Sequence, residues 1–350
     1  MAKNNSKITR QKALERIEKG RRSKWWRRKG TPKSGFTYCD KDGKKIAAKA
    51  DLQRIEDLVI PPAWKYVRIS PSPRGKLQAA GIDEAGRVQY LYSEAFRRKR
   101  EREKFKKIED FGGFLPKLLE KTNRDMHLDG FPKDKILALV IRLINSLYIR
   151  IGSDDSVKKF RTYGITTLKK DHLKIGHDGT LTFDFVGKHR VRQRKVMVDE
   201  ELADLLRKVR KIGNNKKLFV YLDEEGDAHA VKPADINKYI KDSTSTEFSS
   251  KDFRTWGATL LAALELSESG CCEDEKAAKK NIVAAVKNVA EELGNTPSVC
   301  RGSYIHPSVI KAYEEGITLE EFTPKKSRRI KRIAGHKPEE KALIKMLRRK

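Results

Sequence analysis

The sequence predicts an α+β protein, in which a small β-rich N-terminal domain precedes a mainly α-helical domain that contains a β-hairpin. Residues 35–93 show period-two alternation, as in Val88-Gln89-Tyr90-Leu91-Tyr92, between turn-forming residues. From about Ile108 apolar residues recur at helical spacing, and within residues 162–198 the period returns to two. These three observations define the fold class.

The same patterns divide the chain into five parts. We expect a basic arm at 1–34, the β-rich domain at 35–95, a charged helical linker at 96–107, the mainly helical domain at 108–323 and a basic tail at 324–350. In the arm, Trp25 and Trp26 lie among cations. They either stack on bases or dock the arm on the fold.

Within the helical domain each element has its own signal. A broad apolar stripe from Ile136 to Leu147 predicts a buried helix. Leu181, Phe183 and Phe185 alternate with polar residues before Gly187-Lys188, which predicts a hairpin with Lys188 near its tip. Further helices are expected over 200–211, 232–241, 254–266 and 273–293, and Thr296-Pro297 has the cap and first-turn residues of another, with Tyr304 about two turns along it.

Charge indicates a polyanionic partner. Of the net charge of +30, residues 1–35 carry +11 and residues 324–350 carry +10. Basic ends favour nucleic acid, which releases counterions on binding. An acidic membrane surface is less favoured because lipidation signals and a clear amphipathic insertion face are missing. No secretory signal opens the chain, and the four cysteines show no zinc spacing, so an intracellular, reducing location is expected.

Five residues of the second half supply what attack on a phosphodiester requires. Arg150 and Arg254 are fixed cations that can bond non-bridging oxygens bidentately, and we expect both at helix boundaries. Lys188 can donate a proton to a leaving alkoxide, Asn295 can donate a neutral hydrogen bond, and Tyr304 is a hydroxyl nucleophile. Each has an ordinary alternative: a solvated surface cation, a turn lysine, a helix-end asparagine or a packing tyrosine.

As an ordered set, these residues resemble the type IB DNA topoisomerases, specifically the small poxvirus and bacterial kind, from about Leu58 to Pro307. The segments that carry the resemblance are Ile60-Pro61-Pro62-Ala63-Trp64, Gln89-Tyr90-Leu91-Tyr92, Tyr148-Ile149-Arg150-Ile151-Gly152, Thr162-Tyr163-Gly164-Ile165-Thr166-Thr167-Leu168, Phe185-Val186-Gly187-Lys188, Arg254-Thr255-Trp256-Gly257 and the segment that ends at Tyr304.

The resemblance implies the catalytic fold that topoisomerase IB shares with tyrosine recombinases, at residues 108–323, and a DNA-clamping role for the β-rich domain. It implies that Tyr304 attacks the phosphate, that Arg150 and Lys188 promote expulsion of the 5′ oxygen, and that Arg254 holds the phosphate. Gln89, Tyr90 and Tyr92 would face the DNA. Tyr90 and Tyr92, two apart on a strand, would share one face.

The chain departs from the poxvirus pattern at two places. Asn295 stands where poxvirus members carry His, and bacterial relatives can carry Asn there. An amide donates a hydrogen bond but does not titrate, so we expect this residue to stabilise charge and not to move a proton. Ser153, Asp155 and Ser156 replace basic and aromatic residues that help poxvirus enzymes read a pentameric site, which argues against tight sequence specificity.

The predicted function is therefore ATP-independent, metal-independent relaxation of supercoiled duplex DNA by a monomer that clamps it, with no cofactor. No phosphate-binding P-loop is visible. Two alternatives stay open. A tyrosine site-specific recombinase uses similar residues, but it usually has a His-x-x-Arg motif and a helical amino domain. A non-enzymatic basic nucleic-acid-binding protein would use the five residues for structure and phosphate contacts.

Overall fold

The computed structural model describes residues 2–213, 216–244, 247–272, 274–323 and 338–349. The chain forms two compact units, Met1–Lys104 and Phe105–Lys350. Helix α3 (Glu94–Met126) begins in the first unit and continues in the second. Among the residues described, no helix combines the length and apolar character that a bilayer crossing needs.

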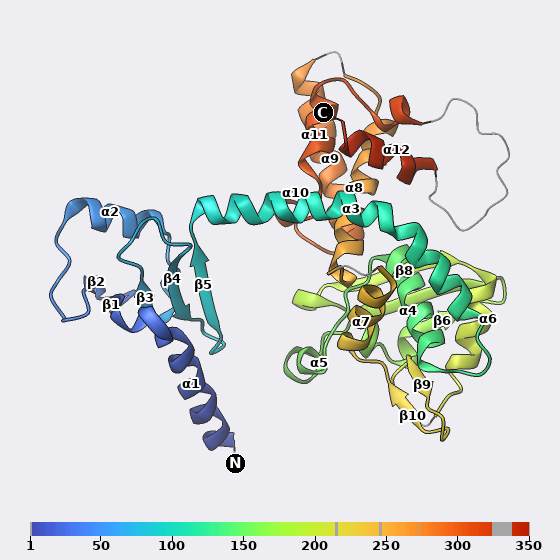
Figure 1. The fold of residues 1–350 in the computed structure, drawn as a ribbon, viewed down its shortest axis with the longest axis horizontal. Helices are drawn as coiled ribbons and strands as arrows, with labels where there is room; N and C mark the ends of the chain where they lie inside the picture. Colours follow the sequence, from blue (N-terminus) through green and yellow to red (C-terminus); the bar gives the residue numbers. More distant parts are fainter. Residues whose placement is uncertain (1, 214–215, 245–246, 273, 324–337, 350) are drawn as a thin grey trace. The chain divides into compact units, whose positions relative to one another are not determined.

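The first unit is built on a five-stranded antiparallel sheet with the order β2-β1-β3-β4-β5 (Figure 1). Its strands are β1 (Trp26–Thr31), β2 (Gly35–Cys39), β3 (Lys65–Ile69), β4 (Leu77–Ile82) and β5 (Val88–Tyr92). Helix α2 (Lys49–Asp57) packs Ile55 against Val67 and Ile69 on one face. On the other face, helix α1 (Ala2–Glu18) packs Ala13 and Ile17 against Ile82. The β-rich N-terminal domain is thus present, with a helix on each face.

The structure differs from the expected basic arm at 1–34. Residues Trp26–Thr31 form strand β1, which pairs with both β2 and β3, so they belong to the sheet. The side chain of Trp26 packs on the cluster around Ile55, and the guanidinium of Arg54 lies 5.1 Å from its ring centroid. Trp26 therefore docks on the fold, which was the second of the two alternatives. The short 3-10 helix η1 (Gly20–Lys24) connects α1 to this strand.

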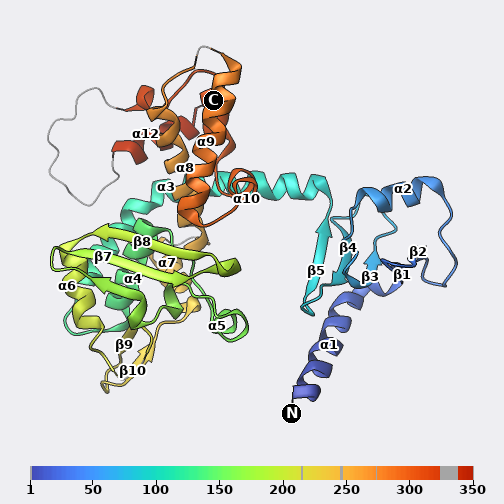
Figure 2. The same cartoon turned by 180° about the vertical axis from the view of Figure 1, so that it is seen from behind.

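The second unit is mainly helical. Its helices after α3 are α4 (Lys133–Leu147), α5 (Asp154–Phe160), α6 (Glu200–Val209), α7 (Pro233–Thr244), α8 (Ser250–Glu268), α9 (Glu275–Leu293), α10 (Pro297–Ser303), α11 (Pro307–Glu314) and α12 (Pro338–Leu347). Its strands are β6 (Leu173–Ile175), β7 (Thr180–Val186) and β8 (Arg192–Val198), in one antiparallel sheet of that order, and the pair β9 (Val220–Leu222) and β10 (Ala228–Ala230). Figure 2 shows β7 and β8 side by side from behind. The predicted hairpin and fold class are confirmed.

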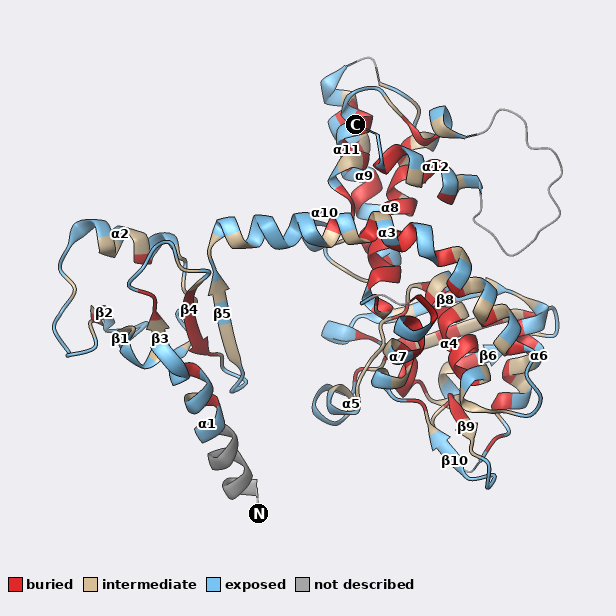
Figure 3. Ribbon diagram, in the orientation of Figure 1, coloured by how far each residue is buried: buried red, intermediate tan, exposed pale blue. Residues whose placement is uncertain are grey.

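The core of this unit lies along α4 and α8. Nine residues of α4 are buried, as the apolar stripe from Ile136 to Leu147 predicts (Figure 3). Trp256 of α8 packs on Gly112 of α3, where a β-carbon would come within 2.5 Å of the indole. The predicted basic tail at 324–350 is wrong for its last part. Ala342, Leu343 and Met346 of α12 are buried in this core, while residues 324–337 lie outside the described residues.

Candidate active site

Arg150 is held just beyond the end of α4. Tyr148 caps that helix in the left-handed region (φ 52°) and turns the chain outward. The N–H groups of Ile165 and Thr166 donate to the carbonyl oxygens of Arg150 and Ile151 at 2.8 and 3.0 Å. This close approach requires glycine, because a β-carbon on Gly164 would lie 2.4 Å from the Arg150 oxygen. The backbone of Arg150 is therefore fixed from both sides.

Arg254 is a buried cation in the second turn of α8. The helix begins at Ser250, so Arg254 does not lie at the helix boundary that the sequence predicted. Its side chain is 4% exposed and donates to the carbonyl oxygens of Tyr148 and, at 2.8 Å, Leu293. Because those two carbonyls close helices α4 and α9, Arg254 joins the C-terminal ends of both.

Gly257 makes room for this arrangement one turn further along α8. A β-carbon there would lie 2.1 Å from Cε1 of the Tyr148 ring. The ring thus lies directly on the helix backbone, and this contact sets the position of the Tyr148 carbonyl that receives Arg254. Burial raises the pKa of Tyr148 to about 12, so its phenol stays neutral and acts as a packing group.

Asn295 and Arg150 meet at the end of α9. Gly294 caps that helix in the left-handed region (φ 60°), and the N–H of Asn295 then donates to Ala290 at 2.8 Å. The Arg150 guanidinium donates to the carbonyl of Gly294 at 2.9 Å and to Oδ1 of Asn295. With Oδ1 occupied, Nδ2 of Asn295 is buried and has no hydrogen-bond partner among the described residues, and the same is true of Nε of Arg254. Two buried donors are thus left for an acceptor that the described part of the chain does not supply.

Tyr304 follows directly after α10, whose cap Thr296 and first residue Pro297 are as the sequence predicts. The N–H of Tyr304 donates to Cys300 at 2.9 Å, and its carbonyl oxygen lies 3.2 Å from the hydroxyl of Thr259 in α8. The guanidinium carbon of Arg254 lies 5.4 Å from the Tyr304 ring centroid. Arg150, Arg254, Asn295 and Tyr304 therefore gather at one place in the second unit.

The guanidinium groups of Arg150 and Arg254 repel one another. Burial lowers the pKa of Arg150. Burial, and then the charge of Arg150, lower the pKa of Arg254 to about 10, which still leaves the side chain charged at neutral pH. An anion placed between them would relieve this repulsion and accept from the free donors. The arrangement is suited to a phosphate.

Lys188 lies at the tip of the β7–β8 hairpin, in the short 3-10 turn η4 (Lys188–Arg190), and is exposed. His189 and Arg190 have positive φ values of 62° and 63°. The Lys188 ammonium makes no hydrogen bond or ion pair with any residue that the structure describes. Lys188 is therefore connected to the other four candidate residues only through the residues next to it. The side chain of Gln193 packs against both Gly187, which precedes Lys188, and Gly294, which precedes Asn295.

The three candidate DNA-binding residues lie on β5 of the first unit. Tyr90 and Tyr92 are exposed on one face of the sheet, with ring centroids 6.4 Å apart. Gln89 faces the other way, and its amide donates to the carboxylate of Asp83 at 2.8 Å. Within the described structure the two tyrosines are thus available to a ligand, while the amide of Gln89 is bonded to Asp83 in the turn between β4 and β5.

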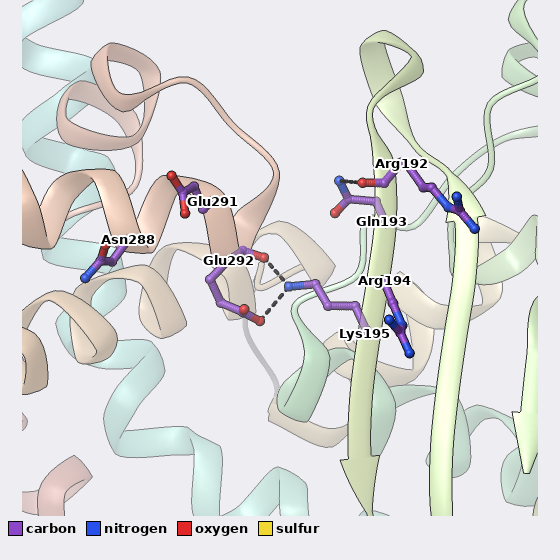
Figure 4. Close-up of a pocket in the computed structure, with 7 residues that line it drawn as sticks. All are labelled: Arg192, Gln193, Arg194, Lys195, Asn288, Glu291 and Glu292. Carbon is purple, nitrogen blue, oxygen red and sulfur yellow. Dashed lines mark hydrogen bonds and ion pairs between the residues drawn. The ribbon is translucent and has the colours of Figure 1, made fainter. Parts of the chain in front are cut away.

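Sequence reasoning missed the residues of β8 that join the hairpin to α9. Lys195 is 7% exposed and contacts Glu292 (Figure 4). Gln193 packs on Gly294. The signal was in the sequence: Lys195 and Gln193 lie opposite Phe183 and Phe185 in the hairpin register, so strand alternation places them on the core side. Figure 4 also shows Arg192, Arg194, Asn288 and Glu291, which line the same hollow of about 340 Å³.

Comparison with known proteins identifies the family. The model of the eukaryotic DNA topoisomerase I catalytic core matches residues 93–331, and that of the bacterial DNA topoisomerase IB N-terminal domain matches residues 35–83. The chain is 33% identical to DNA topoisomerase 1B of Acanthamoeba polyphaga mimivirus over 81% of its own length and 86% of the relative's. It is 23% identical to DNA topoisomerase 1B of Vaccinia virus (strain Copenhagen) over 69% of its own length and 73% of the relative's.

Buried Arg254 and half-buried Arg150 lie beside Tyr304 in a helical unit that follows a β-rich one, and the two matching family models assign both units to the type I DNA topoisomerases. The chain belongs to the type IB DNA topoisomerases. The resemblance drawn from its motifs is confirmed.

Proposed function

We propose that this enzyme relaxes supercoiled duplex DNA by cutting and resealing one strand through a 3′-phosphotyrosine at Tyr304, without metal or nucleotide. The observation that carries the proposal is the gathering of Tyr304, Arg150, Arg254 and Asn295, with two buried donors unused. A phosphodiester placed there would accept hydrogen bonds from the donors that the described residues leave unpaired.

In the proposed cleavage step, the phenol oxygen of Tyr304 attacks phosphorus and loses its proton to solvent. The bond from phosphorus to the 5′ oxygen breaks, and Lys188 gives that oxygen a proton. Arg150, Arg254 and Asn295 donate to the non-bridging oxygens, where negative charge increases in the transition state. Religation is the reverse: the 5′ hydroxyl attacks phosphorus and Tyr304 leaves. Since the phosphotyrosine keeps the energy of the broken bond, no nucleotide is required.

The role of Asn295 follows from its contacts. Its Oδ1 accepts from Arg150, so its Nδ2 is fixed as a donor toward the free side of the site. Removing one such donor from an oxyanion site costs about 10²- to 10³-fold in rate. Because an amide has no proton to exchange near neutral pH, this residue stabilises charge in the transition state.

The first unit would hold the duplex. Its sheet exposes Tyr90 and Tyr92 beside each other, and tyrosine hydroxyls are among the groups that hydrogen-bond to the phosphates of duplex DNA. We propose that these two tyrosines contact the DNA and that the enzyme works as a monomer inside the cell. Gln89 would join them only if it released Asp83.

Plasmid relaxation in EDTA without ATP, with wild type beside Tyr304→Phe, tests this function. Wild type should relax a plasmid that lacks any recombination site, and denaturant should trap it covalently on nicked DNA. Tyr304→Phe should bind the same DNA with unchanged affinity and give neither product. Relaxation by the variant would refute the role of Tyr304, and wild-type dependence on a specific DNA site would favour a recombinase.

A further inference from the structure

The inward face of β8 carries polar side chains where the register calls for apolar ones. In the antiparallel pairing Lys195 lies opposite Phe183, and Gln193 lies opposite Phe185, and both phenylalanines are buried. A buried ammonium costs free energy unless it is paired. Each of these two polar residues contacts the same short stretch, Glu292 to Gly294, at the end of α9.

Lys195 binds the end of α9 twice. Its ammonium donates to the main-chain oxygen of Glu292 and, at 2.5 Å, to the Glu292 carboxylate (Figure 4). The last carbonyls of a helix have no partner within the helix and carry partial negative charge, so a cation is favourable there. The ammonium thus fixes strand β8 against the last turn of α9, two residues before Gly294.

Gln193 fills a gap that two glycines create. A β-carbon on Gly187 would lie 2.9 Å from Cγ of Gln193, and one on Gly294 would lie 2.4 Å from its Nε2. Any larger residue at either position would push the strand and the helix end apart. One side chain therefore spans from the residue before Lys188 to the residue before Asn295.

We propose that Lys195 and Gln193 are positioning residues that hold the hairpin tip, and with it Lys188, beside the Arg150–Asn295 pair. The proposal rests on the proposed function, since it assumes that Lys188 protonates the leaving 5′ oxygen. Lys188 is exposed in a turn with two left-handed residues, so its own surroundings do not fix it. The two β8 contacts fix the hairpin to the end of α9: Gln193 packs on Gly294, whose carbonyl accepts from Arg150, and Lys195 binds Glu292 two residues earlier.

The test separates protonation of the leaving group from every other step. Covalent adduct formation is measured in a single turnover with excess enzyme, on a duplex that carries oxygen or sulfur at the 5′ leaving position. A thiol, with a pKa near 8.5, leaves as an anion without help, whereas an alkoxide needs a proton. The variants are Lys195→Met, Gln193→Ala, Lys188→Ala and the control Arg194→Met, which removes an exposed cation of the same strand.

We expect Lys195→Met and Gln193→Ala to slow cleavage of the oxygen substrate about 10- to 100-fold, the loss that a displacement of about 1 Å can cause. On the sulfur substrate both should cleave within about threefold of wild type, as should Lys188→Ala. Lys188→Ala/Lys195→Met should cleave no more slowly than Lys188→Ala, because both changes remove the same contribution, the protonation of the leaving oxygen by Lys188. Arg194→Met should match wild type on both substrates.

The inference would be overturned if Lys195→Met slowed cleavage of the oxygen and sulfur substrates equally. It would also be overturned if the rate losses of the two single variants multiplied in Lys188→Ala/Lys195→Met. If Lys195→Met unfolds, Gln193→Ala decides alone, because it removes no buried charge and leaves the Lys195–Glu292 contact in place. If sulfur rescues Lys188→Ala but neither β8 variant, the positioning inference fails and the proposed mechanism stands. If sulfur fails to rescue Lys188→Ala, the assigned role of Lys188 is itself wrong, and the inference fails with it.

Discussion

Replacing Gly257 by alanine tests how the buried arginine is held. The new β-carbon would lie 2.1, 2.5 and 2.6 Å from Cε1, Cζ and Cδ1 of Tyr148. Carbon atoms in contact normally lie about 3.5 to 4.0 Å apart, so the ring must move by roughly 1.5 Å. The ring lies in the core beside the Tyr148 carbonyl that binds Arg254, so its displacement shifts the acceptor as well.

Two measurable effects follow. Overpacking of this kind costs about 1 to 3 kcal/mol, which lowers the midpoint of thermal unfolding by about 2 to 10 °C in a unit of this size. Displacing Arg254 by about 1 Å slows single-turnover cleavage about 100-fold, while DNA affinity changes little. Calorimetry and denaturant-trapped adduct formation measure these effects on the same preparation.

The matched control is Gly302→Ala, in α10. A β-carbon there meets nothing within 4 Å, and alanine in a helix is favoured over glycine by about 1 kcal/mol. This variant should keep its cleavage rate and unfold at the same or a higher temperature. If Gly257→Ala behaved like Gly302→Ala in both assays, the packing of Tyr148 on α8 would not position Arg254, and the reasoning would fail.

Three further changes test other parts of the structure. Asn295→Ala should slow single-turnover cleavage about 100-fold and leave the shape of the pH–rate profile between pH 6 and 9 unchanged, since no titrating group is lost; an altered profile would contradict its role as a neutral donor. Burial raises the pKa of the Cys300 thiol from 9.0 to about 11, so the stability that the thiol contributes is complete below about pH 9 and is lost as the pH rises toward 11. The free energy of unfolding of wild type should therefore exceed that of Cys300→Ala by roughly 1 to 2 kcal/mol less at pH 11 than at pH 8, as measured by denaturant unfolding. A constant difference would exclude this linkage. Arg28→Met removes the donor that the carbonyl oxygens of Pro61 and Trp64 accept from, at 3.1 and 2.6 Å. Amide hydrogen exchange should therefore accelerate by about 10- to 100-fold in β3 and β4 but not in α8. Acceleration in both units would show that they do not open separately.

The fold class was predictable because periodicity is a local signal. The hairpin follows from Phe183 and Phe185 alternating with polar residues, and α4 follows from its apolar stripe. The predictions of an arm and a tail were wrong in part because they rested on the excess of Lys and Arg at the two ends of the chain. Trp26 contributes to a sheet whose other strands lie elsewhere in the chain, and Leu343 and Met346 bury a short apolar face among many cations.

The candidate catalytic residues were selected from ordered motifs, but their contacts were not predictable. Arg150 bonds a residue 145 positions away, and Arg254 bonds carbonyls that close two other helices. Such pairings depend on tertiary packing, which no local pattern encodes. The unpaired donors of Arg254 and Asn295 became visible only once every other polar contact was placed.

The attachment of Tyr304 to its own fold determines which molecule would reseal the DNA in the proposed reaction. Its main chain is bonded to Cys300 and lies against Thr259, and the helices on either side begin at Pro297 and Pro307. Insertion of this tyrosine into the active site of a neighbouring molecule would break those bonds and separate Tyr304 from Arg254. Cutting and rejoining are therefore expected in cis, so that a DNA end caught on one molecule is released by that same molecule, whatever the enzyme concentration.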